Sequence, residues 1–131
     1  SYLFDCASKL CRVLSYKIDI GNRTREAYIA KDMDAMNKII SDYKKMIKET
    51  EAFYYSFKAQ WFRDNKPHGF DVQDIRLGGL IMRMRSCMER LIELRDGKIT
   101  EIPELEEKIL ELYKGKISFN NWKLSVSANV I

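Results

Sequence analysis

The chain has 131 residues, of which 46% are hydrophobic and 32% are charged, and its formal net charge at pH 7 is +4. This length and apolar content predict a single domain, residues 1–131, with a substantial core. No apolar run approaches the roughly 18 residues that cross a bilayer, and no signal-peptide pattern is present, so we expect no membrane partner.

Positive and negative charges interleave along the chain, with 23 Lys and Arg against 19 Asp and Glu. The closest approach to a basic cluster is Lys44, Lys45 and Lys48, which three acidic residues flank. Nucleic-acid binding calls for a clustered basic stripe. We therefore expect no nucleic acid among the partners.

A first helical pattern opens the chain. Apolar residues spaced three and four apart lie on one face of a helix. Because the chain opens on this pattern without a Met, we expect it to be a piece of a longer protein. Gly21 is expected to mark a bend or a break in the helix. The apolar positions are Leu3, Cys6, Leu10 and Val13, continuing to Ala27 and Tyr28.

A second, longer helix is predicted to start at Asp32, which can cap it, and to end before Pro67. Alternating steps of four and three keep its apolar residues on one face for about seven turns. These residues are Met36, Ile40, Tyr43, Ile47, Thr50, Tyr54, Phe57 and Trp61.

Residues 65–79 combine a turn, a helix start and two glycines inside the new helix. Pro67 and Gly69 break the preceding helix. Asp71 is expected to be the N-cap of the next one and to accept a hydrogen bond from the Asp74 N–H. Gly78 and Gly79 then follow within the helix, where each costs about 0.8–1 kcal/mol relative to Ala. We expect a neighbouring group to approach them too closely for a Cβ, which makes this segment a contact surface.

A third long helix is predicted to run to Gly97, which is expected to occupy the C′ position. Short connections near residues 30–32 and 66–70 then give an all-α fold, an antiparallel three-helix bundle over residues 1–97. Its third apolar face consists of Leu77, Leu80, Met84, Cys87, Leu91 and Leu94.

Residues 98–131 differ from the bundle. Pro103 is expected to lie in the first turn of a short fourth helix that carries Leu105, Ile109, Leu112 and Tyr113. Residues 119–131 alternate loosely and are rich in β-branched and aromatic residues, which predicts an extended C-terminal tail. In a larger protein such a tail can lie in a groove or along a sheet edge.

The sequence contains few candidates for a catalytic, metal-binding or redox site. His68 is the only histidine, which excludes Ser-His-Asp, Cys-His and multi-histidine metal sites within this chain. Cys6, Cys11 and Cys87 lack metal or redox spacing and are expected to be small buried hydrophobic residues. Three unpaired thiols favour a reducing compartment, so we expect the cytoplasm. We expect no catalytic residue, no cofactor and no metal ligand in this chain.

Aromatic residues gather near the end of the second helix. Only part of such a band can face the bundle interior, so Tyr55 and Phe62 are expected to face outward. A platform for a sugar ring is one use of exposed aromatic residues, and packing against another domain is the commoner one. The band consists of Phe53, Tyr54, Tyr55, Phe57, Trp61 and Phe62.

The run from Phe57 to Leu80 resembles a signature of the C-terminal α-helical domain of bacterial family 20 glycoside hydrolases, the β-N-acetylhexosaminidases. Upstream, residues 23–28 and the Lys31-Asp32 helix start are similar to that domain. Asn121-Trp122 and residues 127–131 resemble its C-terminal end. The resemblance therefore covers most of the chain.

The resemblance implies that the catalytic machinery lies elsewhere. Family 20 enzymes use an Asp-Glu pair at the mouth of a (β/α)8 barrel, with the 2-acetamido group of the substrate as nucleophile and the Glu as general acid/base. Nothing in this chain matches that barrel segment, so no catalytic residue is carried over. The implied partner is the catalytic barrel of the same polypeptide; a homodimer and a place at the rim of the sugar site are left open.

Two functions remain open. The first is a non-catalytic accessory domain of an enzyme that removes terminal β-linked N-acetylglucosamine or N-acetylgalactosamine, and the second is a free-standing helical adapter that binds a partner protein through its aromatic band. An isolated hydrolase is disfavoured because the acid/base pair is missing. The residues expected at the interface with the barrel are Trp61, Phe62, Asn65, Pro67, His68, Phe70, Gln73, Arg76, Gly78, Gly79 and Trp122.

Overall fold

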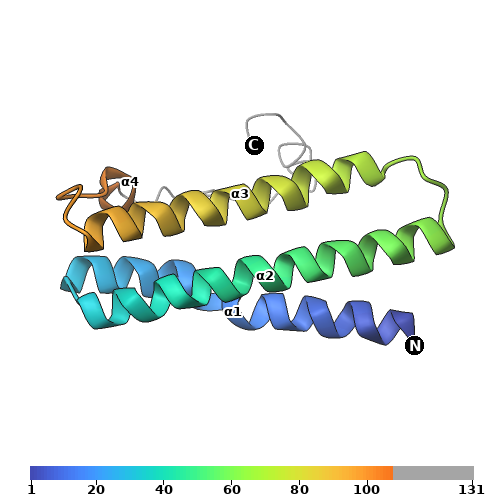
Figure 1. The fold of residues 1–131 in the computed structure, drawn as a ribbon, viewed down its shortest axis with the longest axis horizontal. Coiled ribbons are helices and arrows are strands. Elements are labelled where there is room, and N and C mark those ends of the chain that lie inside the picture. The colour runs from blue at the N-terminus through green and yellow to red at the C-terminus, as the bar shows by residue number, and fades with distance from the viewer. Residues whose placement is uncertain (108–131) are drawn as a thin grey trace, which may run out of the picture.

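The computed structural model describes residues 1–107. The fold consists of three long helices, α1 (Tyr2–Ala30), α2 (Met33–Asp64) and α3 (Phe70–Arg95), followed by the short α4 (Pro103–Glu106). Each long helix runs antiparallel to the one before it (Figure 1). The all-α class, the three-helix bundle and the short fourth helix are confirmed. The predicted extended tail, Trp122 and the remainder of the expected fourth helix lie outside the described residues.

Capping interactions explain the sharp turn between α1 and α2. Lys31 ends α1 in the left-handed conformation, with φ 52. Asp32 then caps α2 as predicted, because its Oδ1 accepts a hydrogen bond from the Ala35 N–H at 2.9 Å. These two residues are the whole connection, so α1 and α2 must lie side by side.

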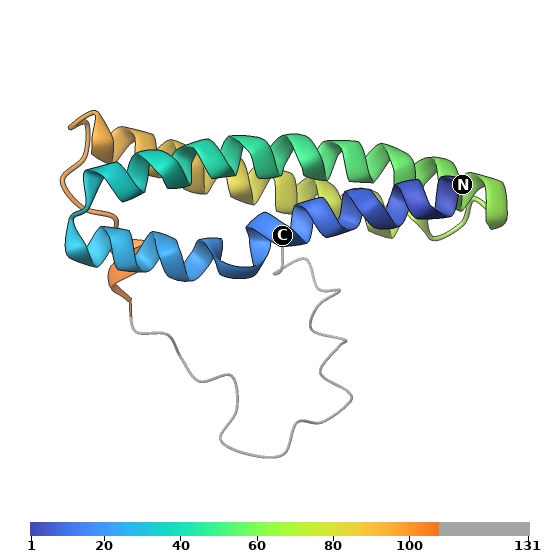
Figure 2. The same cartoon turned by 90° about the horizontal axis from the view of Figure 1, so that it is seen from below.

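Helix α1 continues through Gly21 without a break, and Figure 2 shows a bend in its middle. Its second half packs on α2 through Ile20, Thr24 and Ala27, all buried. Thr24 satisfies its buried hydroxyl by donating to the Ile20 carbonyl at 2.6 Å. The prediction that the apolar pattern extends to the end of this helix is confirmed.

The predicted start of α3 was wrong by two residues. Gly69, with φ 94, is the N-cap, and Asp71 lies inside the first turn, where the negative charge still suits the positive end of the helix dipole. A left-handed glycine can reverse the chain more tightly than Asp71 could, so the helix begins at Phe70.

The predicted end of α3 is confirmed. Gly97 adopts φ 71, its N–H donates to the Leu94 carbonyl at 3.1 Å, and the Lys98 N–H donates to the Glu93 carbonyl at 2.9 Å. This paired pattern is the Schellman motif, which requires a residue with positive φ.

Hydrogen bonds hold α4 against α1. The Tyr28 hydroxyl donates to Glu106 Oε1 at 2.6 Å and accepts from the Ile102 N–H at 3.0 Å. Arg25 donates to the Leu105 carbonyl at 2.9 Å. Ile102, 4% exposed, is thereby fixed in the core.

The main core lies toward the end of the bundle that carries the α1–α2 turn. It draws on α1 from Ile20 onward, on α2 up to Ile47 and on α3 from Met84 onward. Helix α2 packs closely along both neighbours, whereas the backbones of α1 and α3 do not approach each other as closely. A groove of about 610 Å³ therefore remains open between α1 and α3, with α4 at its edge.

Candidate functional site: the aromatic end of the bundle

The opposite end of the bundle, which holds the α2–α3 turn, is organised around Phe70. This side chain is 2% exposed. Four rings of α2 surround it at centroid distances of 5.5–6.0 Å, namely Tyr54, Phe57, Trp61 and Phe62. All four contacts are tilted, and aromatic contacts of this kind stabilise the fold beyond the burial of the ring itself.

Trp61 fixes the turn itself. Its indole Nε1–H donates to the Lys66 carbonyl at 3.0 Å, so the chain is held directly before Pro67. An added Cβ on Gly69 would lie 3.7 Å from the Trp61 ring, an ordinary contact. Gly69 is therefore required by its positive φ and not by lack of space.

Tyrosine–carboxylate hydrogen bonds tie the three helices together at this end. The Tyr54 hydroxyl of α2 donates to Asp74 Oδ1 of α3 at 2.7 Å, and the Tyr2 hydroxyl of α1 donates to Asp64 Oδ1 of α2 at 2.9 Å. Each bond raises the pKa of its tyrosine, because the protonated hydroxyl is the donor. The Arg63 guanidinium also lies 3.9 Å from the centroid of the Tyr2 ring.

The structure separates the expected interface residues into supporting and exposed groups. Phe70 is buried, and Trp61, Gln73 and Gly79 are half-buried, so they shape the surface from below. Phe62 is 50% exposed and faces outward as predicted, as does Tyr55 of the aromatic band, at 67%. The remaining exposed members are Asn65, Pro67, His68, Arg76 and Gly78.

Gly78 and Gly79 do not have the close neighbour expected for them within the described residues. Nothing lies within 4 Å of a Cβ built on either glycine. Within residues 1–107 the structure therefore gives no packing reason for these two glycines.

Asp5, near this end, is engaged in structural pairs. Asp5 Oδ2 accepts from Lys9 Nζ and from Ser56 Oγ, both at 2.7 Å, and these bonds lower the pKa of its carboxyl group. These partners favour the charged form of the carboxylate. Within residues 1–107, no group of three or more His, Cys, Asp or Glu side chains is placed to hold a metal ion.

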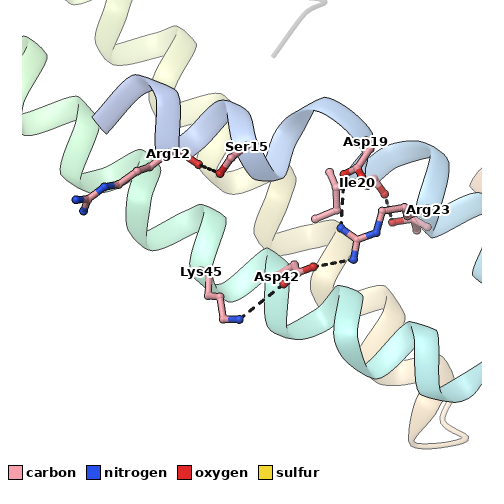
Figure 3. Close-up of polar contacts among 8 residues, drawn as sticks. Arg12, Ser15, Asp19, Ile20, Arg23, Asp42 and Lys45 are labelled. Atoms are coloured by element: carbon pink, nitrogen blue, oxygen red, sulfur yellow. Dashed lines mark hydrogen bonds and ion pairs between the residues drawn. The ribbon is translucent and has the colours of Figure 1, made fainter. Parts of the chain in front are cut away.

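A second polar tie lies farther along the bundle (Figure 3). Arg23 Nη2 of α1 pairs with Asp42 Oδ2 of α2 at 2.7 Å, and this bond raises the pKa of Arg23. Lys45 also approaches Asp42, at 3.8 Å. One lysine of the closest approach to a basic cluster, Lys45, thus takes part in an intramolecular ion pair.

Two features were missed from the sequence. The predicted burial of the thiols is confirmed for Cys6, is only partial for Cys87 and was wrong for Cys11, which is exposed. Cys11 belongs to an apolar face of α1 that the bundle leaves uncovered. The steps of three and four between Phe4, Ala7, Cys11, Leu14 and Ile18 are the sequence signal that could have revealed this face.

Comparison with known proteins places this arrangement in a family. Within residues 1–107, none of the helices has the length and apolarity that crossing a bilayer requires. A search of curated proteins found no match. Residues 1–121 match the model of the Glycoside Hydrolase 20C C-terminal domain. The chain therefore belongs to the family of C-terminal domains of family 20 glycoside hydrolases.

Proposed function

We propose that this domain is the non-catalytic C-terminal part of a β-N-acetylhexosaminidase and that it packs on and stabilises the catalytic barrel of the same polypeptide. The observation that carries the proposal is the family match over residues 1–121. The parent enzyme would hydrolyse terminal β-linked N-acetylglucosamine or N-acetylgalactosamine in the cytoplasm, with its acid/base pair in the barrel.

The rigidity of the aromatic end supports a docking role. A surface that is already fixed before docking loses less conformational entropy when it binds. The Phe70 cluster and the Trp61–Lys66 hydrogen bond fix the turn, while Phe62, Pro67 and His68 remain exposed on it.

The glycines of α3 support the same role. Each costs about 0.8–1 kcal/mol in a helix interior relative to Ala. Because nothing within 4 Å in the described chain explains Gly78 or Gly79, a close approach by the barrel accounts for both. A homodimer that uses the same turn is a further arrangement consistent with this exposure.

The test is Gly79→Leu in the intact enzyme. Leu is the better helix former and has space in this domain, so the domain should keep its helix content. If the barrel covers Gly79, the added side chain should separate the unfolding of this domain from that of the barrel in calorimetry.

Lys44→Leu is the matched control, because Lys44 is an exposed residue within α2 and lies away from the α2–α3 turn. It should leave the cooperative unfolding unchanged. Equal behaviour of the two variants would contradict docking through Gly79. Residues 1–131 alone should not cleave a chromogenic N-acetylglucosaminide, and turnover would contradict a non-catalytic role.

A further inference from the structure

Seven apolar residues form one uncovered face along the first half of α1. With about 100° between successive residues, they fall within a sector of about 120°. We name this the α1 apolar face. All seven are exposed: Leu3, Phe4, Ala7, Leu10, Cys11, Leu14 and Ile18.

The exposure of this face is large for an apolar surface. Phe4 is 79% exposed, Ile18 83% and Leu14 48%. The five charged residues between positions 1 and 20 all lie outside the sector. A contiguous apolar surface without charges is typical of a site that another protein surface covers.

Contacts on its other side hold α1 in this orientation. Cys6 and Val13 are buried against the bundle. Asp5 accepts a hydrogen bond from Ser56 of α2 at 2.7 Å, and Tyr2 donates to Asp64 of α2 at 2.9 Å. Turning the α1 apolar face inward would break these contacts, so the described bundle cannot cover the face by a simple rotation of the helix.

We propose that the α1 apolar face is the main docking surface for the catalytic domain of the same polypeptide. This proposal rests on the proposed function and adds to it the surface that makes contact. A C-terminal domain follows its catalytic domain, so the connection between them reaches α1 at its N-terminal end. The face begins in the first turn of that helix.

The position of the face in the fold agrees with this assignment. Both views place the N-terminus at the same end of the bundle as the α2–α3 turn (Figures 1 and 2). The main core lies toward the other end. The α1 apolar face thus begins at the end of the bundle that the main core does not fill, where a covering partner adds burial.

The covalent connection favours this partner over a separate molecule. A tethered domain is present at a high effective concentration, on the order of millimolar for a short linker. The catalytic domain is therefore the occupant that meets this face first, ahead of a second copy of the chain.

Cys11 is a built-in reporter for the test. In the intact enzyme under native conditions, its alkylation by N-ethylmaleimide, followed by mass spectrometry of the peptide, should be at least about tenfold slower than in the enzyme unfolded in urea. Cys6 serves as internal reference, because the bundle itself buries it. Rapid alkylation of Cys11 in the native intact enzyme would overturn the proposal.

Ile18→Glu should break the docking, because it places a charge in the covered apolar face. Cys11 should then become reactive, and the domain should unfold apart from the barrel. Met33→Glu is the matched control, since Met33 is also an exposed apolar residue, at 40%, but it begins α2 at the end of the bundle opposite the α2–α3 turn. Identical behaviour of the two variants would overturn the assignment.

If something other than the catalytic domain covers the α1 apolar face, the reactivity of Cys11 changes under different conditions. If Cys11 becomes reactive on removal of residues 108–131 while the domains still unfold together, the C-terminal residues of this chain cover the face and the proposal fails. If Cys11 becomes reactive when the enzyme is diluted until it is monomeric, a second copy of the chain covers the face, and the proposal fails as well.

The unfolding of the two domains and the reactivity of Cys11 together distinguish a failure of this inference from a failure of the proposed function. Joint unfolding of the domains with a reactive Cys11 overturns only the α1 assignment. Independent unfolding of the two domains in the unaltered enzyme overturns both.

Discussion

At Gly69 the chain passes from the turn into α3 with φ 94, a conformation that side chains with a Cβ rarely adopt. Trp61 precedes Gly69 in the sequence and Phe70 follows it directly, and their rings pack against each other with centroids 5.8 Å apart. The turn therefore depends on one backbone conformation and one aromatic contact, and each can be tested separately.

Gly69→Ala should lower the free energy of unfolding by about 1–2 kcal/mol, the cost of a left-handed residue with a Cβ. Urea denaturation at equilibrium measures the change. Gly21→Ala is the opposite case, since Gly21 lies inside α1 with open space around it. It should raise the free energy of unfolding by about 0.5–1 kcal/mol, and a loss at Gly21 would contradict this account.

The Tyr54 hydroxyl should make stability depend on alkaline pH. Its bond to Asp74 raises its pKa above the ordinary 10.0, so the folded state holds the proton more tightly than the unfolded state. The stabilisation is complete below pH 10.0 and is lost as pH rises through the raised pKa. Tyr54→Phe should flatten the alkaline decline in the free energy of unfolding, whereas Tyr55→Phe, at an exposed neighbour, should leave the decline unchanged.

At the scale of elements, the helix boundaries follow local chemistry wherever a side chain or a glycine closes the end. Asp32 caps α2 and Gly97 closes α3, and both were readable from the sequence. The start of α3 was misjudged because an Asp at position 71 and a glycine at position 69 are both acceptable caps. Only the path of the turn over Trp61 selects Gly69.

Asp32→Ala should lower the free energy of unfolding by about 1 kcal/mol, because the Ala35 N–H loses its acceptor. Asp34→Ala is the control, since Asp34 lies in the same first turn but caps no N–H. It should cost less, about 0.3–1 kcal/mol from the helix dipole alone. Thermal unfolding followed by circular dichroism compares the two, and a larger loss at Asp34 would contradict the capping role.

At the scale of the whole molecule, the core is displaced toward the α1–α2 turn, and the opposite end relies on half-buried aromatic rings and exposed polar ties. Helix α2 is the only element that packs along both other long helices in residues 1–107. Its apolar side chains therefore contribute most to holding the bundle together.

Met46→Ala should be among the most damaging substitutions in α2. Met46 is 1% exposed, and truncating a buried Met to Ala costs about 2–5 kcal/mol. Met82→Ala makes the same chemical change at a side chain that is 60% exposed. It should change the free energy of unfolding by no more than about 0.5 kcal/mol, and comparable losses at the two positions would show that the core is misplaced.

The sequence by itself determined the helices, their order and most of their ends, because periodic apolar spacing and caps such as Asp32 and Gly97 act over only a few residues. It also carried the family resemblance in the run from Phe57 to Leu80. The tertiary structure alone decided that Phe70 is a buried anchor, that Cys11 is exposed and that Gly78 and Gly79 lack a neighbour within residues 1–107. Those outcomes depend on which faces of neighbouring helices meet, and two apolar faces of one helix look alike until packing covers only one of them.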